Sequence, residues 1–67
     1  MIKEKVGKRI KELRHLLNIS QEELSFRSGV HRTYIASLEV GKRNVSIITL
    51  EKIVDALEMT LSAFFDF

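Results

Sequence analysis

The chain has 67 residues and a formal net charge of +2; 45% of its residues are hydrophobic, 30% are charged, and cysteine and proline are absent. This length supports one small hydrophobic core, so we expect a single domain that association would stabilise further. The composition argues against a disulfide-bonded, secreted or membrane-spanning protein, because cysteine, a signal-peptide pattern and a long apolar run are all missing. We therefore expect a cytoplasmic protein.

Charge is distributed unevenly along the chain. Residues 1–45 carry ten lysines and arginines against five acidic residues, a balance of +5, whereas residues 46–67 carry one lysine against four acidic residues, a balance of −3. The basic part can be attracted to phosphates, and the acidic part should face away from them. The lysines near the amino terminus fit this role, or equally a solvated helix face: Lys3, Lys5, Lys8 and Lys11.

The first predicted element is an amphipathic helix over residues 2–17. It ends in a turn made by Asn18 and Ile19. Its apolar residues fall on one stripe at helical spacing, namely Val6, Ile10, Leu13 and Leu17. Because no alternating strand pattern follows anywhere in the chain, the sequence predicts an all-α fold.

Residues 21–40 are predicted to form two helices joined by a turn. Ser20 can cap the first helix, because its hydroxyl can accept from the free amides of the first turn. Gly29 can adopt the left-handed conformation that closes this helix, and Val30 then docks the turn on the core. In the second helix, the apolar residues that share a face with Val30 are Ile35 and Leu38.

The opposite face of the second helix has chemistry suited to DNA. Arg32 can donate two parallel hydrogen bonds to guanine, and Thr33 offers a hydroxyl and a methyl group to base edges. Tyr34 suits the sugar-phosphate backbone, and small side chains further along would let the helix sit deep in a groove. Four residues of this helix are therefore predicted to contact DNA: Arg32, Thr33, Tyr34 and Ser37.

Further contacts are predicted on either side of this helix. The loop after it supplies Lys42, Arg43 and Asn44, which can grip the DNA backbone or reach a base. Asn44 can instead close its own loop. Gln21, at the positive end of its helix, can contact a phosphate or act only as a cap. For His31 a local hydrogen bond and a phosphate contact are both open.

Two more helices are predicted in the carboxyl-terminal part. Ser46 caps the first, which extends to about residue 57, and Thr60 caps the second, over residues 61–65. Surplus apolar residues in this part predict a homodimer interface about a two-fold axis: Ile47, Ile48, Met59, Leu61, Phe64 and Phe65. Phe64 can equally belong to the core. Such a dimer would set two reading helices roughly 34 Å apart on a pseudo-palindromic site.

Residues at a family's characteristic spacing run through most of the chain: Gly7, Arg9, Ile10, Leu13, Arg14, Gln21, Leu24, Gly29, Val30, Ile35, Leu38, Glu39, Gly41, Lys42, Arg43, Ser46, Leu50, Glu51, Lys52 and Ile53. In these residues the span from about Val6 to Leu61 resembles the helix-turn-helix domain of the Cro and phage-repressor (Xre) family. The resemblance implies an all-α, five-helix, lambda-repressor-like DNA-binding domain over residues 1–67, with the motif at 21–40 and a dimerisation surface in 46–67. It also implies a partly buried ion pair between Arg14 and Glu39.

Within this family, three stretches most resemble controller proteins of restriction-modification operons: Arg32-Thr33-Tyr34-Ile35, Arg43-Asn44-Val45 and Phe64-Phe65. The resemblance implies a homodimeric transcription regulator that binds double-stranded DNA at its own promoter, with no small-molecule ligand and no membrane contact. The alternatives are a Cro-like phage repressor, or an antitoxin whose carboxyl-terminal apolar face binds a toxin protein.

Catalysis and metal binding find no support in the sequence. His15 and His31 lack ligand spacing with any acidic residue, and neither forms a base and nucleophile set with a serine. A phosphate-binding glycine loop and a zinc pattern are also missing. We therefore expect a protein that is not an enzyme and needs no metal or other cofactor.

Overall fold

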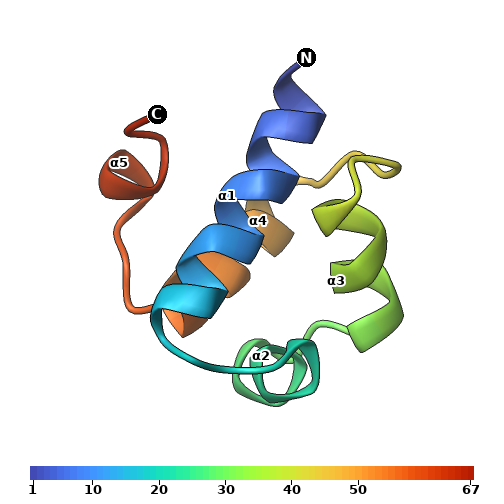
Figure 1. The fold of residues 1–67 in the computed structure, drawn as a ribbon, viewed down its shortest axis with the longest axis vertical. Helices are drawn as coiled ribbons and strands as arrows, with labels where there is room; N and C mark the ends of the chain where they lie inside the picture. Colours follow the sequence, from blue (N-terminus) through green and yellow to red (C-terminus); the bar gives the residue numbers. More distant parts are fainter.

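The computed structural model describes all 67 residues as five helices without strands (Figure 1). The helices are α1 (Ile2–Leu16), α2 (Gln21–Ser28), α3 (Arg32–Glu39), α4 (Ile47–Ala56) and α5 (Leu61–Phe64). In Figure 1, α1 crosses the middle of the molecule in front of α4, with α3 to one side of this pair and α5 to the other. The predicted all-α, five-helix fold is confirmed, and the helix ends lie within one residue of those expected.

Local side-chain chemistry sets the starts of three helices. The hydroxyl groups of Ser20, Ser46 and Thr60 each accept from the backbone N–H group three residues later, at 3.0, 3.1 and 3.1 Å. All three predicted N-caps are therefore confirmed. Gly29, with φ of 75°, closes α2 in the predicted left-handed conformation. His31 precedes α3, but its side chain makes no capping hydrogen bond.

Two helix ends use a left-handed residue that is not glycine. Asn18 after α1 has φ of 58°, and Glu58 after α4 has φ of 61°. In both turns the N–H group of the next residue, Ile19 or Met59, donates to a carbonyl five residues back in the helix, at 3.1 Å. Asparagine adopts this conformation readily, whereas for a glutamate it costs about 1 to 2 kcal/mol. These turns redirect the chain towards α2 and α5.

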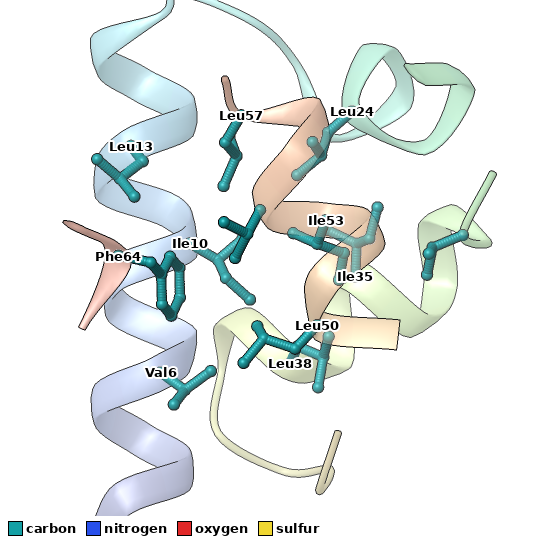
Figure 2. Packing of buried hydrophobic residues seen from close by; sticks show 12 residues of the cluster. Val6, Ile10, Leu13, Leu24, Ile35, Leu38, Leu50, Ile53, Leu57 and Phe64 are labelled. Atoms are coloured by element: carbon teal, nitrogen blue, oxygen red, sulfur yellow. The ribbon is translucent and has the colours of Figure 1, made fainter. Parts of the chain in front are cut away.

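Twelve buried apolar residues form one core between the helices (Figure 2). Figure 2 shows Phe64 of α5 beside α1, near Ile10, and its side chain is fully buried. The prediction that Phe64 lies in a dimer interface is therefore wrong, because a helix of only four residues needs a buried anchor. The core residues are Val6, Ile10, Leu13, Leu24, Val30, Ile35, Leu38, Leu50, Ile53, Val54, Leu57 and Phe64.

At Gly7 the helix α1 lies so close to α3 that no side chain would fit. A Cβ atom placed there would be 2.0 Å from the carbonyl oxygen of Leu38. Gly7 is a buried residue within α1, so the position requires the absence of a side chain rather than an unusual backbone conformation. This close approach seats the last turn of α3 directly on α1.

A buried ion pair joins α1 to the end of α3. Arg14 donates from Nε and Nη2 to the two carboxylate oxygens of Glu39, at 2.8 and 2.9 Å, and the two side chains are only 9% and 3% exposed. The hydrogen bond to Glu39 raises the pKa of Arg14 above its ordinary value, although burial acts in the opposite direction. The ion pair implied by the family resemblance is thus confirmed.

The same pair also holds the turn between α1 and α2. Arg14 donates from Nη1 to the carbonyl oxygen of Ile19 at 2.9 Å. Gln21, the first residue of α2, donates from its side-chain nitrogen to Glu39 at 3.0 Å. No buried side-chain nitrogen or oxygen in the chain lacks a hydrogen-bond partner. The network therefore fixes α1, α2 and α3 relative to one another with every buried side-chain nitrogen and oxygen satisfied.

Replacing Gly7 by alanine should lower the free energy of unfolding by about 3 kcal/mol, because the methyl group must push α3 away from α1. The matched control is Gly29→Ala, which meets nothing within 4 Å and should cost only about 1 to 2 kcal/mol through backbone strain. Urea denaturation at a fixed protein concentration measures both. Equal stability of the Gly7 variant and the unaltered protein would contradict the close contact.

Replacing Arg14 by methionine should cost about 3 to 5 kcal/mol, because Glu39 then stays buried without its partner. The double variant Arg14→Met/Glu39→Leu removes both charges and should recover most of that loss. Urea denaturation of the unaltered protein, the single variants Arg14→Met and Glu39→Leu, and the double variant forms a double-mutant cycle. Single variants whose losses simply add in the double variant would show that the two side chains are not coupled.

Candidate nucleic-acid interface

Helix α3 turns one face to the core and the opposite face to solvent. Ile35, Leu38 and Glu39 are buried, whereas Arg32 and Thr33 are exposed at the start of the helix. The apolar spacing read from the sequence therefore placed the two faces of this helix correctly. The side chains of Arg32 and Thr33, at the start of α3, are therefore accessible to an external partner.

Further along the same face, Ser37 is only partly available. Its hydroxyl donates to the carbonyl oxygen of Thr33 at 3.0 Å, and the side chain is half-buried. A hydroxyl in this arrangement can still accept a hydrogen bond, but its proton is committed to the helix backbone. Ser37 therefore offers a small surface and an acceptor, and its role as a DNA contact stays a prediction.

Tyr34 connects α3 to the loop that follows it. Its hydroxyl donates to the backbone carbonyl oxygen of Asn44 at 3.2 Å, and the guanidinium carbon of Arg43 lies 4.9 Å from the centre of its ring. With its proton used in this way, the tyrosine hydroxyl cannot donate to a phosphate in the same conformation. The two contact patches predicted separately from the sequence are thus parts of one surface.

Basic side chains on this surface carry no internal neutralising partner. Arg32, Lys42 and Arg43 are exposed, and none of them is in an ion pair within the chain. Their charge therefore remains available for phosphates or base edges. Lysines on α1 are likewise exposed and unpaired, which fits both roles considered for them: Lys3, Lys5, Lys8 and Lys11.

Gln21 makes an internal contact that neither of the roles considered for it includes. Its side-chain nitrogen donates to the buried carboxylate of Glu39, and the residue is half-buried. The capping role belongs to Ser20, whose hydroxyl accepts from the Glu23 N–H group. The amide nitrogen of Gln21 carries a second N–H group that can still donate to a phosphate, and the free backbone N–H groups of the first turn can do so as well. The predicted phosphate contact of Gln21 therefore stays a prediction.

An apolar area lies next to the loop after α3. Ile47 and Ile48 are 63% and 67% exposed, and Phe65 is 41% exposed. Met59 and Leu61 are half-buried and pack against the core. A hollow of about 350 Å³ includes Ile47 and Phe65 in its lining. Its other apolar lining residues are Ile2, Val6, Val45 and Leu50, and its polar ones are Lys3, Arg43 and Asn44. The sequence indicated its carboxyl-terminal part, but it did not indicate that α1 contributes Ile2.

Neither a membrane-spanning helix nor a metal-binding cluster is found in the structure. No helix is long and apolar enough to cross a membrane. No three or more histidine, cysteine or acidic side chains gather closely enough to hold a metal ion. The features that the structure does bring together are the exposed end of α3, the basic loop after it and the neighbouring apolar area.

Comparison with known proteins identifies the family. Residues 10–64 match the model of the family described as helix-turn-helix. Control protein C.MunI of Mycoplasma sp is 45% identical over 65 residues, which cover 96% of this chain and 88% of that protein. Control protein C.BamHI of Bacillus amyloliquefaciens is 42% identical over 62 residues, or 91% of this chain and 76% of that protein. These relatives are named as control proteins and not as enzymes, in agreement with the prediction of a non-enzymatic protein.

Solved structures show the same similarity in three dimensions. The restriction-modification controller protein C.AhdI from Aeromonas hydrophila superposes with a TM-score of 0.90 at 40% identity, covering 94% of this chain and 96% of that one. The controller protein C.Esp1396I, solved as a tetramer with its natural 35 base-pair operator, gives a TM-score of 0.94 at 36% identity and covers 98% of this chain and 87% of that one. The family model, the relatives and the solved structures agree. The chain therefore belongs to the helix-turn-helix family and is a DNA-binding regulator of the restriction-modification controller type.

Proposed function

We propose that this protein is the homodimeric controller of a restriction-modification operon and binds a pseudo-palindromic operator in the cytoplasm. One observation carries the proposal. Arg32 and Thr33 stand exposed at the start of α3, and the loop that Tyr34 holds beside them carries two further unpaired cations, Lys42 and Arg43. A helix end with this chemistry fits the major groove of DNA.

In this proposal the residues of α3 read the bases. Arg32 donates two parallel hydrogen bonds to O6 and N7 of a guanine, and Thr33 contacts an adjacent base edge or a thymine methyl group. Ser37 lies one turn further on and is small enough to let the helix approach the groove floor. Sequence preference therefore depends on the first turn of α3.

The loop after α3 grips the sugar-phosphate backbone beside the groove. Lys42 and Arg43 neutralise phosphates, and Asn44 adds an amide that can donate to a phosphate oxygen. Tyr34 sets the position of this loop, because it bonds the Asn44 carbonyl and supports the Arg43 guanidinium. These contacts raise affinity for any duplex and fix the register of the reading helix.

The apolar area around Ile47 and Ile48 joins two copies of the chain. Both side chains are more than half exposed, and a second copy related by a two-fold axis would cover them symmetrically. Dimerisation and DNA binding are then linked, so operator occupancy follows the concentration of the protein. The similarity to control proteins supports a role at the promoter of a restriction-modification operon. In this proposal the promoter is the protein's own, so the protein regulates its own expression.

Selection of bound fragments from a random DNA pool tests this function. The expected product is a pseudo-palindrome whose two half-sites are roughly 10 base pairs apart from centre to centre, because the two reading helices are related by the dimer axis. Binding to the selected site should also weaken steeply as salt is raised. Enrichment of asymmetric sequences, or no enrichment at all, would contradict the proposal.

Changing Arg32 to alanine should cost about 1 to 3 kcal/mol of binding to the selected site and relax the preference at one base pair. The matched variant is Lys42→Ala, which should weaken binding to all sequences by a similar factor, because a phosphate contact carries no sequence information. Fluorescence anisotropy on a panel of single-base variants of the site measures both effects. A full base preference in the Arg32 variant would remove Arg32 from the reading residues.

A further inference from the structure

Arg9 differs from the exposed cations that surround it on α1. Its side chain is only 16% exposed. The guanidinium donates from Nε to the carbonyl oxygen of Phe64 at 2.8 Å and from Nη2 to the carbonyl oxygen of Ala63 at 2.9 Å. The third nitrogen, Nη1, contacts Glu12 at 2.6 Å. Arg9 therefore joins the first helix of the chain to the last.

The two carbonyl groups that Arg9 binds lie at the carboxyl end of α5. The last carbonyl groups of a helix have no partner within it, and they form its negative end. Arg9 supplies a donor to the Phe64 carbonyl and an additional donor to the Ala63 carbonyl, which also accepts from the Asp66 N–H group at 3.2 Å. It also places a positive charge there. A helix of four residues is too short to be stable alone. Three features therefore hold it in place: the cap by Thr60, the burial of its own Phe64 ring in the core, and the hydrogen bonds from the Arg9 guanidinium.

Aromatic side chains follow directly after these carbonyl groups. The ring of Phe65 lies 5.1 Å from that of Phe64, edge to face, and 6.0 Å from that of Phe67. Phe65 and Phe67 are 41% and 56% exposed. Phe65 also lines the apolar hollow together with Ile2 and Ile47. The end of α5 that Arg9 holds thus carries one wall of the apolar area assigned to the dimer.

We propose that Arg9 is a positioning residue for the homodimer: it fixes the end of α5 so that Phe65 is set to pack against a second copy. The inference rests on the proposed homodimer and assigns no DNA contact to Arg9. The contact with Glu12 is secondary, because the Glu12 carboxylate is 60% exposed and a pair that water reaches from one side contributes little. The two hydrogen bonds to the carbonyl oxygens of Phe64 and Ala63 position the end of α5.

Sedimentation equilibrium of the full chain without DNA tests this role. Arg9→Lys keeps the charge but loses the planar fork that reaches two carbonyl groups, and it should raise the dimer dissociation constant by roughly tenfold. Glu12→Gln keeps both carbonyl bonds and is the matched control, with a dissociation constant within roughly twofold of the unaltered protein. Phe65→Ala should weaken the dimer by removing the ring that Arg9 positions.

The double variant Arg9→Lys/Phe65→Ala separates positioning from a general loss of stability. If Arg9 acts through Phe65, the lysine change should add little to the effect of Phe65→Ala. Additive effects, an unchanged dissociation constant in Arg9→Lys, or a variant that circular dichroism shows to be unfolded would each overturn the proposal. The unaltered protein is measured first. If it is monomeric at every concentration tested, the proposed homodimer itself is contradicted, whatever the variants show.

Discussion

The buried pair of Arg14 and Glu39 is the interaction on which the arrangement of the reading helix depends. It connects α1 to the end of α3, and Gln21 and Ile19 extend it to the start of α2 and the turn before it. Because the pair is nearly inaccessible to water, losing one partner leaves an uncompensated charge in the core. Gly7 complements the pair by letting α1 approach α3 directly. The ion pair and this close contact therefore fix the position of α3, including its exposed end.

Among the basic residues of this chain, two groups have the same charge but different surroundings. Arg9 and Arg14 are mostly buried and hold helices together through planar, multiply bonded guanidinium groups. Arg32, Lys42 and Arg43 are exposed and have no ion pair within the chain. The net charge of +2 therefore understates the positive potential on the surface proposed to meet DNA.

Features governed by neighbouring residues could be predicted from the sequence. The caps at Ser20, Ser46 and Thr60 and the closing Gly29 depend on contacts within a few residues, and the apolar spacing identifies the buried side of each helix. The exposed position of Arg32 and Thr33 followed from the same spacing. The pair of Arg14 and Glu39 was accessible only through family resemblance, since no local pattern joins residues on different helices.

What the sequence did not indicate depends on contacts between distant parts of the chain. For Phe64 the sequence left an interface and the core open, because composition cannot show which of several neighbouring aromatic side chains fills the core; the structure buries it fully. Gln21 and Arg9 were not recognised as internal donors, because their partners lie 18 and about 54 residues away. The left-handed turn at Glu58, before α5, is a local feature, but the sequence did not indicate it because no glycine stands there.

Nuclear magnetic resonance of the labelled protein bound to its selected operator tests the central claim most directly. The account predicts intermolecular contacts from the Thr33 methyl group and the Arg32 guanidinium to protons of the base edges, with Arg14 still bonded to Glu39. Base contacts that arise instead from the outer side of α1, with Arg32 and Thr33 unaffected by DNA, would contradict it.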